Sequence, residues 1–172
     1  GLAAALMWVL PPLLAVKVAL AIMLAMLPAG LSVLCWGMKK SPLLGLLGVA
    51  LVWSHLTHWG FINYLAAIGM MAMALGLTLR QLRCPSRRLG RLLLLALLAI
   101  FVTHPVRFPI ALLLVALTAV VMFPATRRLR PVVAPIVTAG AVFAVWWLFL
   151  SIFLCFFWDF IFRKIYLTFI MC

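Results

Sequence analysis

The chain has 172 residues, of which 70% are hydrophobic and 9% are charged, and its 14 Lys and Arg residues are accompanied by a single acidic residue. A soluble domain needs a polar surface that this composition cannot supply, so lipid is the expected solvent. The net charge of +13 does not indicate a nucleic-acid partner, because the basic residues form short clusters between apolar runs instead of a continuous basic face.

The first apolar stretch, residues 1–16, is interrupted by Pro11 and Pro12 and is too short to cross a bilayer alone. We expect it to be a truncated span or an amphipathic segment on the outer side. It lacks the basic start of a cleavable signal peptide. From the character of both ends we expect the chain to be an internal fragment of a longer protein.

Six spanning helices are predicted from the lengths of the apolar runs. A bilayer core of about 30 Å needs about 20 helical residues, and runs of nearly twice that length fold back as hairpins. Basic clusters at 39–40, 80–91 and 127–130 separate the runs, and the positive-inside bias places them in the cytoplasm. The expected spans are residues 18–38, 42–58, 60–79, 91–104, 108–125 and 132–157.

The predicted fold is therefore an all-α, polytopic helix bundle in a bacterial inner membrane. We expect residues 1–142 to form the bundle and the aromatic-rich residues 143–172 to continue the last transmembrane helix. The only carboxylate, Asp159, lies four residues before Arg163 and is expected to pair with it on the helix. Gly69 and Gly76, with alanines between them, predict close packing against another helix.

Polar side chains outside the basic clusters gather at two predicted outer turns. One turn carries His55, His58 and Asn63, and the other carries His104 and Arg107. Two hairpins packed side by side would place these groups at one depth, and ionisable groups at a membrane are candidates for function. The alternative is that they are polar only because the turns contact water.

Three kinds of chemistry are compatible with the residues of this cluster. His55, His58 and His104 could ligate zinc, but no carboxylate or thiolate accompanies them. A histidine could act as a general base, but no nearby acid would fix its tautomer. The preferred hypothesis is a lipid-phosphate site, in which Arg107 forms paired hydrogen bonds to phosphate oxygens and the imidazoles assist. The residues assigned to it are His55, His58, Asn63, His104 and Arg107.

Other catalytic or cofactor motifs are not found in the sequence. The cysteines have no CxxC spacing, which favours neither a zinc site nor a disulfide framework, and there is no glycine-rich phosphate loop, nucleophile elbow or HExxH motif. No metal and no cofactor are predicted. The cysteines are Cys35, Cys84, Cys155 and Cys172.

The stretch His58-Trp-Gly-Phe-Ile-Asn-Tyr-Leu, followed by a Leu/Ala/Met-rich helix, a basic loop, a Leu-rich helix and then His104, resembles the C-type membrane glycosyltransferases of bacteria. The resemblance covers about residues 18–140. Gly60, Phe61, Asn63 and Tyr64 would match the family's turn, and His104 its later helix. It implies a many-helix membrane fold and a sugar donor linked to polyprenyl phosphate.

The acidic residues that such enzymes use in their first outer loop are missing, since no acidic residue precedes Asp159. The resemblance therefore implies a fragment or degenerate relative without catalytic activity. Its partners would be membrane lipids, with the isoprenoid tail of a polyprenyl phosphate between residues 42–79 and 91–125. The alternatives are a transporter or permease subunit, disfavoured because Thr118 is the main polar residue near mid-bilayer, and a purely structural membrane protein. The oligomeric state is not predicted.

Overall fold

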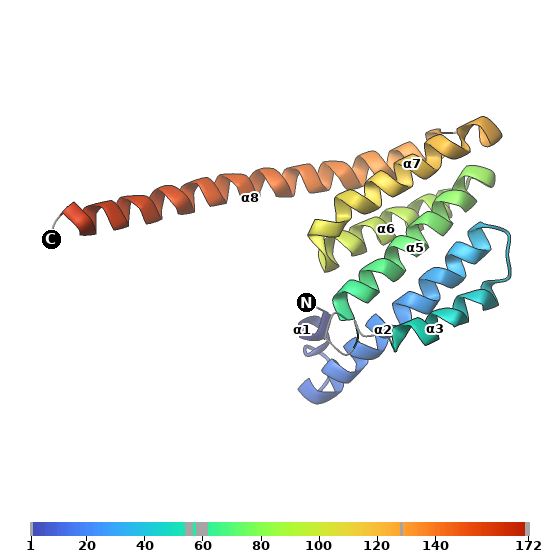
Figure 1. Cartoon of the computed structure of the whole chain (residues 1–172), viewed down its shortest axis with the longest axis horizontal. Coiled ribbons are helices and arrows are strands. Elements are labelled where there is room, and N and C mark those ends of the chain that lie inside the picture. Colours follow the sequence, from blue (N-terminus) through green and yellow to red (C-terminus); the bar gives the residue numbers. More distant parts are fainter. Residues whose placement is uncertain (1, 54–56, 58–61, 128, 171–172) are drawn as a thin grey trace.

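A computed structural model describes residues 2–53, 57, 62–127 and 129–170, with side chains as far as Cys155 (Figure 1). These residues form an all-α fold with seven α-helices and two short 3-10 helices. The α-helices are α1 (Leu2–Leu6), α2 (Pro12–Gly37), α3 (Leu47–Val52), α5 (Ile62–Arg83), α6 (Arg87–Thr103), α7 (Phe108–Thr126) and α8 (Arg130–Ile170). The 3-10 helix η1 (Pro42–Leu46) precedes α3, and η2 (Pro105–Arg107) precedes α7.

Four segments are long and apolar enough to cross a membrane, namely Pro12–Gly37, Ile62–Arg83, Pro105–Thr126 and Arg130–Cys155. By helix length and hydropathy the chain is a multi-pass membrane protein, which confirms the predicted class. The count of six is supported only in part. Helix α6 has 17 residues, and the described portion of the predicted span 42–58 forms only a short apolar helix, Pro42–Val52.

Helix boundaries differ from the prediction mainly at the two ends of the chain. Helix α2 begins at Pro12 instead of residue 18, because a proline in the first helical turn needs no backbone N–H and already has a helical φ angle. Lys17 therefore lies within α2. At the other end, α8 is one helix of 41 residues that runs from Arg130 to Ile170 and so extends past the predicted span 132–157 into the residues expected to continue it.

Helices α2 and α5 run side by side in the same direction and touch through glycines (Figure 1). A Cβ atom on Gly30 would collide with the backbone of Gly69, and one on Gly37 would collide with the backbone of Gly76. Only glycine permits this backbone contact, because any side chain would separate the helices. The predicted packing role of Gly69 and Gly76 is confirmed.

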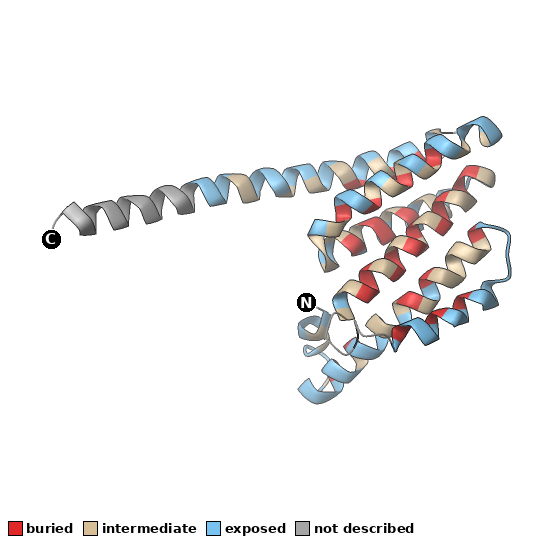
Figure 2. Ribbon diagram, in the orientation of Figure 1, coloured by how far each residue is buried: buried red, intermediate tan, exposed pale blue. Residues whose placement is uncertain are grey.

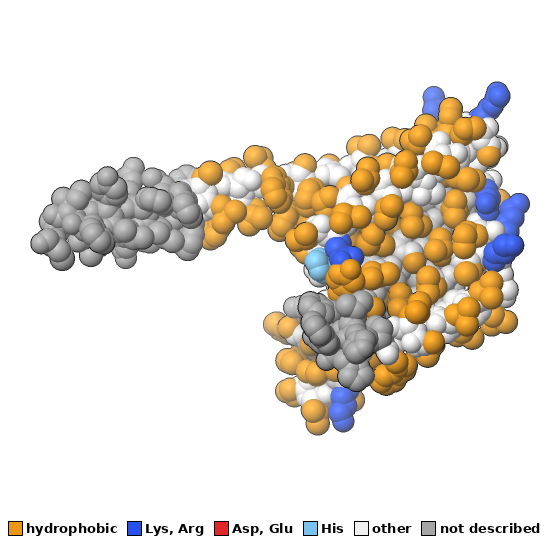
Figure 3. All heavy atoms as spheres, viewed as in Figure 1, with side chains coloured by type: hydrophobic (Ala, Val, Ile, Leu, Met, Phe, Trp, Pro, Cys, Tyr) orange, Lys and Arg blue, Asp and Glu red, His pale blue; other side chains and the backbone are white. Residues whose placement is uncertain are grey.

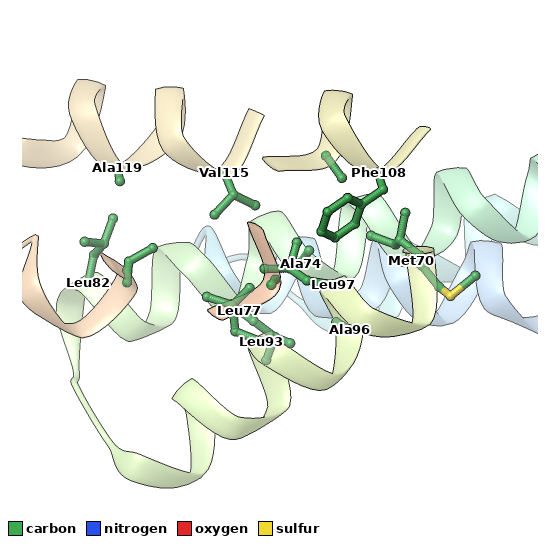
Figure 4. Close-up of a cluster of buried hydrophobic side chains, with 14 of the residues drawn as sticks. Met70, Ala74, Leu77, Leu82, Leu93, Ala96, Leu97, Phe108, Val115 and Ala119 are labelled. Carbon is green, nitrogen blue, oxygen red and sulfur yellow. The ribbon is translucent and has the colours of Figure 1, made fainter. Parts of the chain in front are cut away.

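Helices α5, α6 and α7 enclose the main core (Figure 4). Leu77 of α5, Leu97 of α6 and Val115 of α7 point toward one another, and all three are buried. Phe108, at the start of α7, is fully buried in the same cluster. In Figure 2 helix α5 is buried or half-buried along almost its whole length, whereas α6 and α7 also have exposed outward faces. Since those outward faces are apolar, lipid is the solvent they fit.

The basic residues gather at one end of the bundle. Figure 3 shows Lys and Arg side chains concentrated where α2 leads to η1, α5 to α6 and α7 to α8. We call this the basic end, and the end where α6 turns into α7 the opposite end. The single-sided clustering expected of the loops at 39–40, 80–91 and 127–130 is thus found in the described residues.

Helix α8 packs on the bundle only along its first part and then projects well beyond it (Figure 1). Val132 and Ala139 are buried against the bundle, whereas Phe149 and Phe153 are mostly exposed. Figure 2 shows the projecting part as exposed up to the residues that are not described. The Asp159 and Arg163 side chains lie outside the described residues, so their predicted pair stays a prediction.

Candidate functional site

The turn between α6 and α7 positions the candidate site at the opposite end. His104 ends α6 with an extended backbone (φ −152°, ψ 80°), and Pro105 starts η2 because its ring cannot continue the α6 hydrogen-bond pattern. The turn is closed by a hydrogen bond from the Arg107 amide to the His104 carbonyl, 2.9 Å long. This turn lies between α6 and α7, where the predicted spans 91–104 and 108–125 leave a gap.

Arg107 stacks on Tyr64. Its guanidinium carbon lies 3.5 Å from the centre of the Tyr64 ring, which the first turn of α5 presents to the α6–α7 turn. A cation over an aromatic face is attracted by the electron density of the ring, and the contact fixes the plane of the guanidinium. No carboxylate precedes Asp159 in the sequence, and Arg107 forms no ion pair among the described residues. Its charge is therefore oriented but not neutralised.

His104 contributes a buried imidazole nitrogen. The Nδ1 atom is inaccessible and has no hydrogen-bond partner among the described residues. Leaving a polar atom unpaired costs about 1–3 kcal/mol, so such an atom in a turn with an arginine is a candidate contact for a ligand. His104 and Arg107 flank the same short turn, η2, and no hydrogen bond joins their side chains among the described residues.

An apolar cavity of about 630 Å³ opens beside this turn, between α1, α2, α5 and α6. Its polar lining comes from Asn63 and Thr103, which are the sequence neighbours of Tyr64 and His104. The Thr103 hydroxyl donates a 2.7 Å hydrogen bond to the Ala99 carbonyl. Of the two polar side chains that line the cavity, only the Asn63 amide therefore has no partner among the described residues. Flexible apolar side chains line the remainder, including Met23, Met26 and Met70.

Three of the five predicted site residues therefore lie at one end of the bundle: Asn63, His104 and Arg107. They do not form one pocket, because Asn63 lines the cavity whereas Arg107 and His104 do not. His55 and His58 lie outside the described residues, and so does the turn residue Gly60. The zinc alternative needs both of those histidines, and it stays untested.

The contact of Tyr64 with Arg107 is not among the predictions from the sequence, in which Tyr64 only matches a turn of the resembled family. The signal was present, since Tyr64 follows Asn63 at the same predicted depth as Arg107. At the basic end a second stacked pair occurs, with the Arg80 guanidinium 4.5 Å from the Trp36 ring centre. Arg83 also donates a 2.6 Å hydrogen bond to the Gly37 carbonyl at the end of α2.

Two buried or half-buried threonines of the candidate spans bond their own helices. The Thr78 hydroxyl bonds the Ala74 carbonyl and the Thr118 hydroxyl bonds the Leu114 carbonyl, each at 2.7 Å. Neither hydroxyl donor is left for a solute. Comparison with known proteins adds no assignment, since no protein-family model, curated protein or solved structure matches the chain.

Proposed function

We propose that this multi-pass protein belongs to a bacterial inner membrane and binds the phosphate of an isoprenoid carrier lipid at the opposite end of the bundle. Arg107 forms paired hydrogen bonds with the phosphate, and the isoprenoid tail enters the cavity beside it. The His104 ring turns so that its Nδ1 atom, which is inaccessible in this structure, donates a further hydrogen bond. In this proposal the bundle crosses the membrane six times, with α6 and the segment that begins at Pro42 as its short members.

The main supporting observation is the Arg107 guanidinium, whose central carbon lies 3.5 Å from the centre of the Tyr64 ring and which has no acidic partner among the described residues. A planar guanidinium matches the spacing of phosphate oxygens and keeps its charge at any physiological pH. A cation held in this way at the membrane boundary is costly unless an anion offsets it, and a lipid phosphate lies at that depth. The unpaired Nδ1 of His104 supports the same chemistry.

The cavity supports an apolar tail instead of a soluble phosphate ester. Its walls are mainly methyl groups and thioethers, and methionine adapts to irregular apolar shapes. Asn63 at its rim can bond the ester oxygen that joins the tail to the phosphate. The tail then lies between α1, α2, α5 and α6, which is closer to the N-terminus than the sequence alone suggested.

Catalysis is not part of this proposal. The chain resembles C-type membrane glycosyltransferases in its turn and in His104, and we propose that it keeps their scaffold as a fragment or degenerate relative. The acidic residues that such enzymes use are missing before Asp159. The transporter alternative loses support because Thr78 and Thr118 bond their own helices.

The test uses the full chain in a neutral detergent with two matched probes, farnesyl phosphate and uncharged farnesol, and counts bound ligand by native mass spectrometry. We expect farnesyl phosphate to bind at least about tenfold more tightly than farnesol, because two charge-assisted hydrogen bonds distinguish them. Arg107→Ala should abolish that preference. Lys17→Ala removes an exposed charge on the first turns of α2 and is the control.

Equal binding of the two probes would overturn the phosphate site. A loss of preference in both variants would also overturn it, because general attraction to the cationic surface would then explain the binding. Arg107→Lys gives a further check, since it keeps the charge but not the paired hydrogen bonds, and we expect it to recover only part of the preference. A purely structural membrane protein would bind neither probe.

A further inference from the structure

A second pocket, of about 790 Å³, lies at the basic end between the start of α6 and the first turns of α8. Arg87 and Arg91, one turn apart on α6, line one side, and Pro135 and Thr138 of α8 line the other. This pocket is at the far end of the bundle from Arg107, so the two sites share no residue and can be tested independently.

Gln81 fixes the floor of this pocket. It is only 4% exposed, and its amide nitrogen donates a 3.3 Å hydrogen bond to the Pro131 carbonyl of α8. That carbonyl needs an outside donor, because the residue four positions later is Pro135, which has no N–H. The amide oxygen of Gln81 accepts the Ser86 N–H at 3.1 Å. One buried side chain thus joins α5, the α5–α6 turn and α8.

The arginines at the basic end divide into two groups. Arg80 stacks on Trp36, and Arg83 bonds the Gly37 carbonyl. Arg87 and Arg91 have no hydrogen-bond, ring or acidic partner among the described residues. They also project from the first turns of α6, where the helix dipole adds positive potential. The pocket therefore carries positive charge that no acidic group offsets in the part of the chain with described side chains.

The walls of the pocket include apolar as well as polar side chains. Leu94 on α6 and Ala134 on α8 continue the lining. Among the residues that the structure describes, the Thr138 side chain has no hydrogen-bond partner, unlike the helical threonines Thr78, Thr103, Thr118 and Thr126, which bond their own backbones. Its hydroxyl is free to donate to a ligand. The pocket thus offers two guanidinium groups, one hydroxyl and apolar side chains.

We propose that this pocket binds the phosphate headgroup of an anionic phospholipid from the leaflet at the basic end. Arg87 and Arg91 hold the phosphate, Thr138 bonds its ester or glycerol oxygens, and an acyl chain follows Leu94 and Ala134. Two arginines without carboxylates fit a phosphate better than a zwitterionic headgroup, whose ammonium they would repel. The bound lipid occupies the junction of α6 and α8 that Gln81 holds together.

The experiment measures lipid retained by the full chain in native mass spectra after titration with dioleoyl phosphatidylglycerol or dioleoyl phosphatidylcholine. We expect phosphatidylglycerol to bind with at least about tenfold preference. Arg87→Gln with Arg91→Gln should remove the preference. The control is Arg88→Gln with Arg127→Gln, which removes the same charge from exposed positions at the same end that do not line the pocket, and we expect less than a twofold change.

Competition with inorganic phosphate distinguishes a pocket that binds a phospholipid from one that binds a soluble phosphate. Retention of phosphatidylglycerol at about 10 mM phosphate supports the lipid, because the apolar contacts add to the charged ones. Displacement at that concentration overturns the lipid in favour of a soluble phosphate. Equal losses in the pocket and control variants, or no preference between the two lipids, overturn the site itself. Thermal unfolding of each variant in detergent verifies that both double variants fold.

Discussion

Two helix interfaces of this protein are built in opposite ways. Helices α2 and α5 meet backbone to backbone through Gly30, Gly37, Gly69 and Gly76. Helix α8 instead meets the bundle through large rings and one amide: Phe143 lies 5.2 Å from Phe108 between ring centres, and Gln81 bonds the Pro131 carbonyl. The α2–α5 interface depends on glycines, which have no side chain and so let the two backbones touch. The α8 interface depends on a few large or polar side chains.

This difference shows how specific helix pairing arises in lipid, where the burial of apolar side chains contributes little to the free energy of association. In lipid, an apolar side chain gains little by leaving its solvent for a helix interface, so close contact and hydrogen bonds decide which helices pair. Glycines give α2 and α5 many weak contacts along the whole length of the pair. The contacts of α8 are confined to its first turns, which leaves its later part exposed.

The largest expected effect is at the glycine interface. In Gly69→Ala the new methyl group would meet the α2 backbone, with the Leu27 nitrogen 2.7 Å away. Because backbone cannot move aside as a side chain does, we expect a loss of about 3 kcal/mol or more in unfolding free energy, measured by SDS titration in mixed micelles. The matched control is Gly140→Ala in α8, whose methyl group would lie 4.0 Å from Leu112, and we expect a change within about 1 kcal/mol.

A smaller effect is expected where α8 is held by Gln81. Gln81→Leu leaves the Pro131 carbonyl and the Ser86 N–H without their partner, and we expect it to cost about 1–3 kcal/mol in the same titration. Thr118→Val is the control, because that hydroxyl bonds only its own helix, and it should change the value by about 0.5 kcal/mol or less. Equal effects would contradict the bridging role of Gln81.

The smallest effect is expected in the ring cluster of α8. Phe143 has ring contacts with Phe101, Phe108, Trp146 and Trp147 at 5.2–6.1 Å between centres. Phe143→Leu should cost about 1 kcal/mol and change the tryptophan emission spectrum, because aromatic pairing is lost while the residue stays apolar. Phe149→Leu, at a position 69% exposed, should change neither, and an equal change in both would argue against a cluster centred on Phe143.

The sequence was sufficient to predict the features that depend on local composition. Apolar run lengths place α5, α6 and α7 to within a few residues, Pro105 marks the turn before α7, and the basic clusters mark one end. The packing of Gly69 follows from its small size. These features are local, since each depends on a few neighbouring residues and on the solvent.

Contacts between distant residues could not be predicted in this way. Gln81 donates to the Pro131 carbonyl, which lies fifty residues away in sequence. That carbonyl accepts this bond because Pro135 has no N–H to donate to it within α8. The stacking of Arg107 on Tyr64 depends on how the α6–α7 turn approaches the first turn of α5. The start of α2 at Pro12 was missed because the proline was interpreted as an interruption, although the first helical turn accepts it.

The length of α8 has a consequence for how this protein sits in its surroundings. A straight helix of 41 residues measures about 60 Å, roughly twice the thickness of the hydrocarbon layer. Tilting by the usual 20° or so absorbs only a few ångströms of that excess. With Arg130 anchored among the headgroups of one leaflet, the distal half of α8 must emerge from the other leaflet and lie along it or meet another macromolecule there.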